Sequence, residues 1–410
     1  MLQSKLFYKT KKAAPKDETV VSHQYLIRGD FIEQSLSGVY RFLPLGFRVL
    51  KKIEGIIRQE MEALGAQEVI LPAFQQKALW LETGRWTTID PPLFKLKDRH
   101  EKEIALGSTH EEDVTDVFRN RIKSYQDLPI YLFQIQTKFR NEMRSSGGLL
   151  RTREFLMKDL YSFHADEKDG LSFYKKVEKS YFNIFRKCGL DPLCVEASSG
   201  TIGGAVSHEF MVRSMVGEDR VLVCPKCKLS VNIEKKEKDI CQCHVPIDTE
   251  RAIEIGHIFH LGDKYSRAMK AEYSDKEGKQ HSVIMGCYGI GLPRLLATVV
   301  ETNHDEKGII WPKAIAPFLV HLIQIESDAS VKKAAQKLYQ ELQKSGVEVL
   351  YDDRTARTVG EKFAEADLIG IPFRLVISKK TLKTNSVELK KRSEPKSRLV
   401  KLSKIKSYVK

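Results

Sequence analysis

Two runs of alternating apolar and polar residues, joined by a short loop of small residues, constrain the fold of this chain most strongly. Residues 131–140 and 149–161 alternate in the manner of strands that bury one face. The loop between them contains Ser-Ser-Gly-Gly at residues 145–148, a composition that lets the chain turn back sharply. The pattern therefore predicts two antiparallel strands.

Charged and aromatic side chains gather around this loop. Arg140 and Glu142 are two residues apart, so on a strand their side chains point to the same face. The turn then brings Arg151 and Phe155 over that face. A nucleotide would find there a cation for a phosphate, a carboxylate for an exocyclic amine and a ring to stack on. The alternative is a surface strand with a core phenylalanine, which is the common meaning of an isolated Arg-x-Glu.

Three segments, in order along the chain, resemble the motifs of class II aminoacyl-tRNA synthetases. An amphipathic helix expected at residues 46–64, with a strand at 68–71, is similar to motif 1. Phe139-Arg-Asn-Glu142, followed by Arg151-x-x-x-Phe155, is similar to motif 2. The segment 286–294, Gly-Cys-Tyr-Gly-Ile-Gly-Leu-Pro-Arg, is similar to motif 3, a glycine-rich strand that runs into a helix.

Further segments bring the chain closest to bacterial-type prolyl-tRNA synthetases. These segments are Leu43-Pro-Leu-Gly46, Gly84-Arg-Trp86, Gly107-Ser-Thr109-His-Glu111-Glu112, Gly256-His257-Ile-Phe259 and Asp305-Glu-Lys-Gly308-Ile-Ile-Trp311-Pro312. The resemblance covers nearly the whole chain. It implies an aminoacyl-tRNA ligase (AMP-forming) that activates L-proline with ATP and Mg²⁺, transfers it to the 3′ end of tRNA(Pro), and works as a homodimer.

The same resemblance implies a fold of two parts. The first is an α+β catalytic domain with an antiparallel sheet over residues 1–312, in which about 210–255 form a short cysteine-containing insert. Two prolines flank a linker at 312–317, and residues 317–410 form the second part. Strands expected at 320–325, 347–351 and 374–378 alternate there with helices at 330–344 and 360–370. This alternation predicts a compact α/β domain. The amino-acid sequence of this part resembles the anticodon-binding domain of class II synthetases.

The basic tail at residues 388–410 is expected to be a solvated edge hairpin, with RNA contact as the alternative. The net charge of +14 agrees with a polyanionic partner such as tRNA, although many basic proteins never bind nucleic acid.

The resemblance gives the motif residues roles in activating proline. Arg140 is expected to bridge the proline carboxylate and the α-phosphate, because a guanidinium can clamp two oxygens at once. Arg294 would hold the γ-phosphate and stabilise the leaving group, so these two arginines are the catalytic candidates. Glu142 would accept a hydrogen bond from the adenine amino group, Phe155 would stack on the ring, and Arg151 would assist at the phosphates.

Selection of proline is expected at Thr109 and Glu111, which offer a hydroxyl and a carboxylate to the secondary ammonium. An alternative that can hold as well is a helix N-cap, with Thr109 and Glu112 forming a capping box. The candidate proline-binding residues are Thr109, Glu111, Arg140, Phe163 and His257.

Contacts with tRNA are expected at both ends of that molecule. Arg144 is the candidate for the acceptor stem, although the Arg-Ser-Ser-Gly-Gly loop here is less bulky and basic than in many bacterial relatives. Asp352, Arg354 and Lys362 are the candidates for the anticodon, by their position alone.

The segment between Phe210 and Gly256 departs from many bacterial relatives, which insert an editing domain there. About 45 residues leave no room for that domain, so we expect no cis-editing of alanyl-tRNA. Cys224, Cys227, Cys241 and Cys243 occupy this segment instead. Two tight pairs of thiols can form a tetrahedral structural zinc site. Two alternatives stay open: His244 replaces one thiol, or the cysteines bind no metal.

Two further expectations concern metal and location. Glu254 is a candidate ligand for the Mg²⁺ that accompanies ATP. No apolar run approaches the roughly 18–20 residues that span a bilayer, and no signal peptide begins the chain. Seven cysteines in close pairs fit a reducing compartment, so the protein is expected in the cytoplasm with no membrane partner.

Two rival functions use fewer of these features. A non-charging paralogue with the synthetase fold is expected to lack some of the motif residues, all of which are present. A zinc-ribbon module that binds nucleic acid explains only the cysteine segment.

Overall fold

The structure is a computed structural model of the chain. It describes residues 1–14, 18–227, 229–235, 243, 245 and 248–409. The chain divides into two compact units, which we name by their place in the sequence. The central unit contains residues 34–40 and 54–298, and the terminal unit contains residues 1–33, 41–53 and 299–410. The linker expected at 312–317 lies within the terminal unit.

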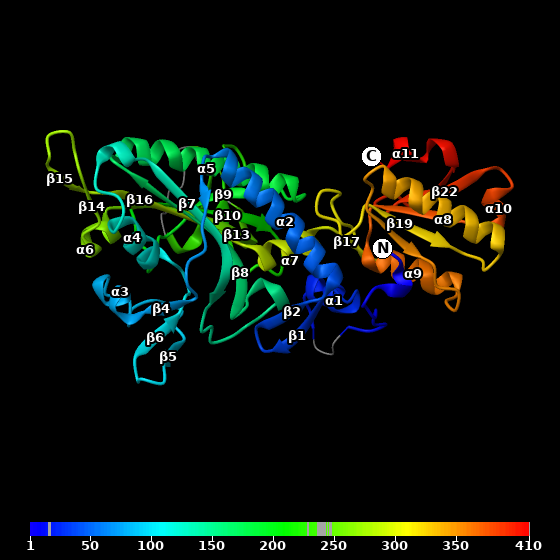
Figure 1. Ribbon diagram of the computed structural model, residues 1–410, viewed down its shortest axis with the longest axis horizontal. Coiled ribbons are helices and arrows are strands. Elements are labelled where there is room, and N and C mark those ends of the chain that lie inside the picture. The colour runs from blue at the N-terminus through cyan, green and yellow to red at the C-terminus, as the bar shows by residue number, and fades with distance from the viewer. Residues whose placement is uncertain (15–17, 228, 236–242, 244, 246–247, 410) are drawn as a thin grey trace. The chain divides into compact units, whose positions relative to one another are not determined.

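A nine-stranded sheet forms the frame of the central unit (Figure 1). Its strand order is β10-β9-β12-β11-β13-β16-β8-β7-β3. The strands are β3 (Gln67–Glu68), β7 (Ile130–Phe139), β8 (Glu154–His164), β9 (Leu193–Glu196), β10 (Val206–Arg213), β11 (Asp219–Val223), β12 (Ser230–Asn232), β13 (Asp248–Gly262) and β16 (Ile284–Gly291). Within the described residues, all pairings are antiparallel except β9–β12 and β3–β7. The predicted antiparallel sheet is confirmed.

The strand pair β7–β8 forms as predicted, but its second strand begins later than expected. Ile130 pairs with Phe163 at one end and Phe139 with Glu154 at the other. Residues Gly148–Leu150 form a 3₁₀ turn instead of a strand. This turn starts from Gly147 and Gly148, whose φ angles of 60° and 64° lie in the left-handed region that glycine adopts at little cost.

Helix α5 (Glu167–Lys187) lies along one face of this sheet (Figure 1). Its buried face carries apolar side chains at helical spacing, which are Phe173, Val177, Tyr181, Ile184 and Phe185. The apolar pattern in the sequence predicts this helix at residues 171–188. The helix begins one turn before residue 171 because the Asp166 side chain accepts a hydrogen bond from the backbone N–H of Asp169.

The helix expected from the motif 1 resemblance is α2 (Pro44–Ala63), and Gly65 follows it with a φ of 81°, as a helix C-terminus favours. The strand after it is shorter than predicted. Pairing as a strand covers only β3, because the backbone N–H of Leu71 donates to the Gln134 side chain instead of to a neighbouring strand.

Smaller elements complete the central unit and its edges. They are α3 (Lys77–Glu82), α4 (Glu111–Arg119), α6 (Lys264–Met269), β4 (Phe74–Gln76), β5 (Lys95–Lys97), β6 (Glu103–Leu106), β14 (Glu272–Ser274) and β15 (Gln280–Ser282). Strands β4, β6 and β5 form a three-stranded sheet, and β14 pairs with β15. Helix α7 (Leu292–Thr302) follows β16 and, like α2, includes residues of both units.

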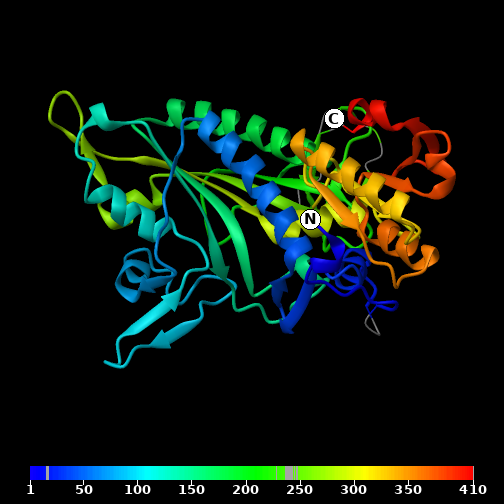
Figure 2. The same ribbon diagram turned by 45° about the vertical axis from the view of Figure 1, so that its right-hand side comes forward.

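The terminal unit contains a five-stranded sheet in the order β20-β19-β21-β22-β23, coloured yellow to red in Figure 2. Its strands are β19 (Val320–Gln324), β20 (Val349–Asp352), β21 (Phe373–Ile377), β22 (Ser386–Lys391) and β23 (Arg398–Lys401). Its helices are α1 (Val21–Arg28), α8 (Ala329–Lys344), α9 (Val359–Ile369), α10 (Lys379–Leu382) and α11 (Ile405–Tyr408). Two short hairpins are also present. The first pairs β1 (Ile32–Leu36) with β2 (Val39–Phe42), and its residues 34–40 belong to the central unit. The second pairs β17 (His304–Asp305) with β18 (Gly308–Ile309) and belongs to the terminal unit.

Strand β19 pairs in parallel with β20 and β21, whereas β22 and β23 are antiparallel. The α/β domain predicted for the C-terminal residues is confirmed. The basic tail forms an edge hairpin as expected only up to the end of β23, because the residues after it form α11 and bury Ile405 and Val409 in the core. The core beneath α8 includes Val320, Leu322, Leu338 and Leu342.

Candidate active site

A cavity of about 400 Å³ opens in the central unit over strands β8, β13 and β16. The structure brings together there eight of the residues singled out in the sequence: Thr109, Arg140, Glu142, Arg151, Phe155, Glu254, His257 and Arg294. They come from segments far apart in the chain, which the sheet places side by side. The volume suits a small ligand of nucleotide size.

Arg140 follows the end of β7 and lines the cavity. The expectation that Arg140 and Glu142 share a strand is wrong, because the backbone N–H of Glu142 donates to the Arg140 carbonyl at 2.7 Å and forms a tight turn. The Arg140 guanidinium lies 5.3 Å from the centre of the Phe155 ring. In the part of the chain that the structure describes, this guanidinium forms no ion pair. Burial and the nearby Arg294 lower the pKa of Arg140.

Glu142 is held by Arg151, whose Nε donates to Glu142 Oε2 at 3.0 Å. A second carboxylate, Glu218, accepts from Arg151 Nη1 at 2.9 Å. Burial lowers the pKa of Arg151, but Glu142 and Glu218 more than offset this and raise it. The turn predicted from the Ser-Ser-Gly-Gly loop therefore does bring Arg151 over Glu142, and Phe155 lines the same cavity.

Arg294 lies in the first turn of α7, and three of its contacts fix it. Its Nε donates to the Leu150 carbonyl at 2.8 Å, and its Nη1 donates to Glu254 Oε2 at 2.6 Å and to the Glu254 carbonyl at 3.2 Å. Burial raises the pKa of Glu254, but Arg294 and then His257 outweigh it and hold that pKa well below the ordinary value.

Thr109 lines the cavity, whereas Glu111 is fully buried and does not line it. The hydroxyl of Thr109 donates to both carboxylate oxygens of Glu111 at 2.7 Å. The predicted capping box is wrong, since His110 is the N-cap of α4 and its side chain forms no capping bond. Glu111 is the first residue of α4.

A buried arginine that the sequence analysis missed supports this pair. Arg85 is 3% exposed, and its Nη1 donates to Glu111 Oε2 at 3.2 Å and to Glu112 Oε1 at 2.9 Å. Burial raises the pKa of Glu111, but Arg85 and Thr109 lower it below its ordinary value. Burial and the charge of Glu111 raise the pKa of Glu112. Arg85 belongs to the quoted Gly-Arg-Trp segment, which was the available signal.

His257 lies on β13 between the cavity and β10. Its Nε2 is 2.5 Å from Ser207 Oγ, and its Nδ1 is 3.5 Å from one oxygen of Glu209 and from one oxygen of Glu254. Burial and then the charge of Glu254 raise the pKa of Glu209. Ligand atoms of Glu209, Glu254 and His257 lie within 4.8 Å of one another, which makes them a candidate metal site.

Two candidates lie away from the cavity. Phe163 does not line it and is fully buried, stacked on Phe118 with the ring centres 4.5 Å apart. Arg144 is exposed in the loop between β7 and β8.

The cavity is also lined by residues that no sequence motif singled out. Asp159 of β8 lines it and pairs with Lys138 at 2.8 Å, although both side chains are almost fully buried. Burial raises the pKa of Asp159, but Lys138 and His110 lower it below the ordinary value. The loop at 198–202, Ser-Ser-Gly-Thr-Ile, also lines the cavity, and only its small-residue composition could have indicated it.

The anticodon candidates form a network inside the terminal unit. Asp352 is fully buried, and its carboxylate accepts from Arg354 Nε and Nη2 at 2.9 Å and 2.8 Å. Lys362 is 2% exposed and donates to the Gln324 carbonyl at 2.6 Å. These contacts fix the loop after β20. Contact of the three residues with an anticodon stays a prediction.

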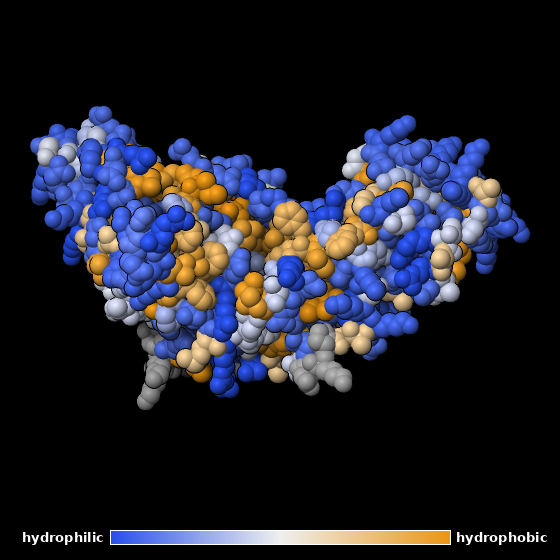
Figure 3. Space-filling model, turned by 60° about the horizontal axis from the view of Figure 1, so that its bottom comes forward, coloured by the Kyte–Doolittle hydropathy of each residue, from blue (hydrophilic) through white to orange (hydrophobic). Residues whose placement is uncertain are grey.

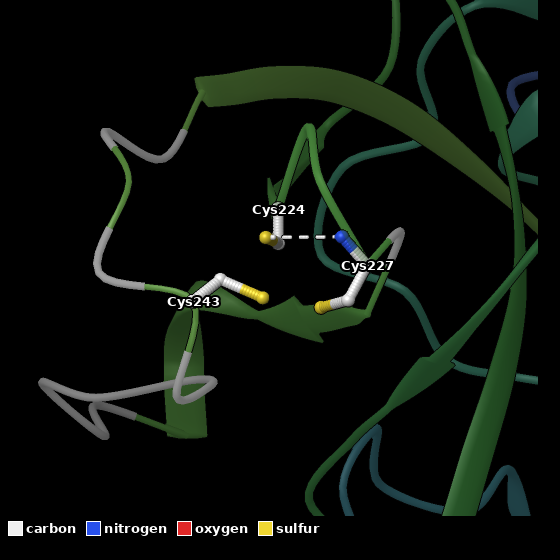
Figure 4. Close-up of side chains that lie close together, drawn as sticks. All are labelled: Cys224, Cys227 and Cys243. Atoms are coloured by element: carbon white, nitrogen blue, oxygen red, sulfur yellow. Dashed lines mark hydrogen bonds between the residues drawn. The ribbon is translucent and has the colours of Figure 1, made fainter.

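Three of the four predicted zinc ligands lie close together (Figure 4). The sulfur atoms of Cys224, Cys227 and Cys243 are within 4.8 Å of one another. Figure 4 shows the three side chains pointing toward a common centre. Cys241 and the alternative ligand His244 lie outside the described residues.

No helix among the described residues is long and apolar enough to cross a membrane.

Comparisons with known proteins agree with the geometry. The family description "tRNA synthetase class II core domain (G, H, P, S and T)" matches residues 94–303, and "Anticodon binding domain" matches residues 318–410. A proline–tRNA ligase of Wolbachia sp. subsp. Drosophila simulans (strain wRi) is 43% identical over 408 residues, which cover 96% of each chain. A prolyl-tRNA synthetase of Cryptosporidium parvum, solved with L-proline and AMP, matches with a TM-score of 0.80 at 20% identity, over 97% of this chain and 77% of that chain.

A second bacterial relative differs in length. The proline–tRNA ligase of Sulfurihydrogenibium sp. (strain YO3AOP1) is 36% identical over an alignment of 543 residues, which covers 96% of each chain. Because the present chain has 410 residues, that relative contains internal residues that this chain lacks.

Proposed function

The chain belongs to the prolyl-tRNA synthetases of class II, and on that premise we propose which of its residues perform the reaction. The enzyme activates L-proline with ATP to form prolyl-adenylate and then transfers the prolyl group to the 3′ end of tRNA(Pro). The observation that carries our assignment is Arg140, a guanidinium that lines the cavity and forms no ion pair within the described residues.

In the activation step, an oxygen of the proline carboxylate forms a bond to the α-phosphorus of ATP, and the bond to pyrophosphate breaks. Because both reactants are anionic, the site must supply cations and in-line positioning. Arg140 bridges the proline carboxylate and the α-phosphate. Arg294 holds the γ-phosphate and stabilises the pyrophosphate that leaves. The ion pair of Arg294 with Glu254 keeps it oriented.

The adenine ring binds between the loop after β7 and strand β8. Glu142 accepts a hydrogen bond from the adenine amino group, because its ion pair with Arg151 fixes the carboxylate in place. Phe155 stacks on the ring, and the outer side of Arg151 contacts the phosphates.

Class II synthetases use Mg²⁺ with ATP, and the donor set here fits that ion. Glu254 supplies a carboxylate to the cavity, and carboxylate oxygen is the ligand type that Mg²⁺ prefers. When bound, the ion neutralises charge on the phosphates. We assign Glu254 as the principal ligand because it lines the cavity.

Thr109 and Glu111 receive the secondary ammonium of proline. The carboxylate of Glu111 is buried, and a buried charge attracts an opposite charge more strongly than an exposed one. His257 forms the opposite side of the proline site, stacked on Phe259 with the ring centres 3.8 Å apart. Phe163 supports the site from the core through its stacking on Phe118.

In the transfer step, a hydroxyl of the 3′-terminal ribose attacks the prolyl carbonyl, and AMP leaves. We propose that residues 1–312 act as the catalytic domain, with the insert at about 210–255, and that residues 317–410 bind the anticodon. Arg144 is exposed and available to the acceptor stem. Because Asp352 and Lys362 are buried, their role at the anticodon is to position Arg354 and its loop.

The enzyme performs no cis-editing of alanyl-tRNA. The segment between β10 and the cavity strand β13 covers only residues 214–247, which include β11 and β12, and it is far too short for a hydrolytic domain. A proline site rejects alanine only through missing methylenes, which are worth about 1–3 kcal/mol. Measurable mischarging follows.

We further propose that the enzyme is a homodimer. Ile70 and Phe74, in the segment after β3, are 82% and 60% exposed, which is unusual for large apolar side chains. On the face shown in Figure 3, apolar side chains of the central unit gather in patches between polar ones. Sedimentation of the purified protein tests the dimer.

We also propose that Cys224, Cys227 and Cys243, together with Cys241, bind one structural Zn²⁺. Three converging sulfur atoms support the site, since thiolates are the ligands that zinc prefers. The location we propose is the cytoplasm, where cysteines stay reduced.

Substitution of Arg140 tests the assignment. Arg140→Lys retains a positive charge but cannot clamp two oxygens, so kcat of proline-dependent ATP–pyrophosphate exchange should fall about 10²–10³-fold. Arg186→Lys, an exposed position on α5, is the matched control and should behave like the wild type. Equal rates for Arg140→Lys and the wild type would contradict the proposed role.

A further inference from the structure

The cysteine turn closes the hairpin of β11 and β12. Cys224 directly follows β11, and its backbone N–H donates to the Leu229 carbonyl at 2.9 Å. The backbone N–H of Cys227 is 3.5 Å from Cys224 Sγ and donates to it (Figure 4). A hydrogen bond to sulfur favours the thiolate, which is the form that binds metal. A metal ion at this point would therefore fix where β12 begins.

Strand β12 connects this turn to the wall of the active site through one side chain. Asn232 ends β12 and is 3% exposed. Its Oδ1 accepts from the backbone N–H of Glu234 at 3.1 Å, so its Nδ2 is the group that points to Glu209. The distance from Asn232 Nδ2 to Glu209 Oε2 is 2.9 Å.

Glu209 in turn lies against His257. The two residues are directly paired between β10 and β13, and His257 Nδ1 lies 3.5 Å from Glu209 Oε1. His257 lines the cavity, whereas Asn232 and the cysteines of the turn do not. A continuous series of contacts thus runs from the cysteine turn through Asn232 and Glu209 to the side of the cavity that we assign to proline.

We propose that the thiolate metal site positions the proline side of the active site through Asn232 and Glu209. Strand β12 has only three residues, which pair with β11, and it meets β9 at a single residue, so only short ladders fix its position. A metal ion joining Cys224, Cys227 and Cys243 holds the hairpin, and thereby holds the amide of Asn232 against Glu209. The inference rests on the zinc and on the proline site proposed above.

Two substitutions at opposite ends of this series test the inference on the full-length protein. Cys227→Ser removes one thiol, and Asn232→Ala removes the amide while leaving all the cysteines in place. Cys194→Ser, a half-buried thiol on β9 outside the cluster, is the matched control. For each protein we would measure zinc content, thermal unfolding, and kcat and KM for proline and for ATP in pyrophosphate exchange.

The expected result is a shared defect with different metal contents. Cys227→Ser should lose zinc and Asn232→Ala should keep it, yet both should raise KM for proline about tenfold, as loss of an outer support does. KM for ATP should change little in either variant, which general unfolding would not produce. The double variant should be no worse than either single variant, because both remove the same support. Cys194→Ser should match the wild type in zinc content and in both KM values.

Three results would overturn the inference. One is wild-type kinetics in Asn232→Ala with full zinc content, and another is wild-type kinetics in zinc-free Cys227→Ser. The third is multiplication of the two defects in the double variant. Absence of zinc from the wild-type protein would instead contradict the metal site, and absence of exchange from the wild type would contradict the function, so the failures are distinguishable.

Discussion

Buried charges at single residues set the chemistry of the cavity. Arg85 lies between Glu111 and Glu112, and all three side chains are almost fully buried. One guanidinium cannot neutralise two carboxylates equally, so the pKa of Glu111 is lowered while that of Glu112 is raised. Glu111 is therefore the member of the pair that carries a negative charge more readily, and it faces the site through Thr109.

Loss of the charge at Glu111 should weaken proline binding selectively. Glu111→Gln keeps the shape but removes the ionic partner of the proline ammonium, and a hydrogen bond to a charged group is worth about 1.5–3 kcal/mol. KM for proline should rise about 10–100-fold while KM for ATP changes little, as pyrophosphate exchange would measure. Glu103→Gln, a position on the surface strand β6, is the control and should leave both constants unchanged. An equal rise in the two KM values would contradict the assignment.

Glu209 predicts a specific pH dependence of stability. Its pKa in the folded protein is above that of the unfolded chain, about 4.3, because it is buried near Glu254. Between those two pKa values the folded state holds a proton that the unfolded state releases, so stability falls as pH rises. Urea unfolding of the ligand-free protein should show this fall above about pH 4.3, and Glu209→Gln should reduce it. An unchanged pH profile in the variant would show that another group is responsible.

At the scale of one element, strand β16 packs closely against its neighbours at one of its glycines and leaves space at another. Its glycines let the strand pass close to neighbouring side chains before α7 begins. A Cβ at Gly286 would lie 2.1 Å from Tyr288 Oη and 2.7 Å from Ser162 Oγ, two groups that are hydrogen-bonded to each other. A Cβ at Gly289 would meet nothing closer than Met157 Sδ at 3.8 Å.

Alanine should therefore be tolerated differently at these two glycines. Gly286→Ala should lower the free energy of unfolding by about 1–3 kcal/mol, the usual cost of overpacking a core. Gly289→Ala is the matched control on the same strand, and its stability should stay within about 0.5 kcal/mol of the wild type. Urea unfolding measures both. Equal stabilities for the two variants would contradict the close packing of β16.

At the scale of the whole molecule, periodicity predicted the regular elements well. Helix α5 and the strand pair β7–β8 both carry strong apolar patterns, and both appear within a few residues of their predicted bounds. The errors lie where local contacts outweigh pattern. The turn after β7 removed Arg140 and Glu142 from their strand, and a 3₁₀ turn shortened β8.

The residues of the candidate site could be predicted from the sequence where they belong to recognisable motifs. Motif resemblance chose eight residues that line the cavity, including Arg140 and Arg294. Asp159 and Lys138 could not be chosen, because a charge pair buried within a sheet is defined by neighbours across strands and has no local pattern. Phe163 was assigned to the pocket by position, and its place in the core depended on packing against Phe118 that the sequence does not encode locally.

We propose that this cavity activates proline and that no editing step in the same chain corrects its errors. Pyrophosphate exchange with the purified protein, run with proline and alanine side by side and followed by deacylation of alanyl-tRNA, tests it most directly. We expect strong exchange with proline, weaker exchange with alanine, and no hydrolysis of alanyl-tRNA. Absence of exchange with any amino acid, from a folded protein that still binds tRNA, would contradict it and favour a non-charging paralogue.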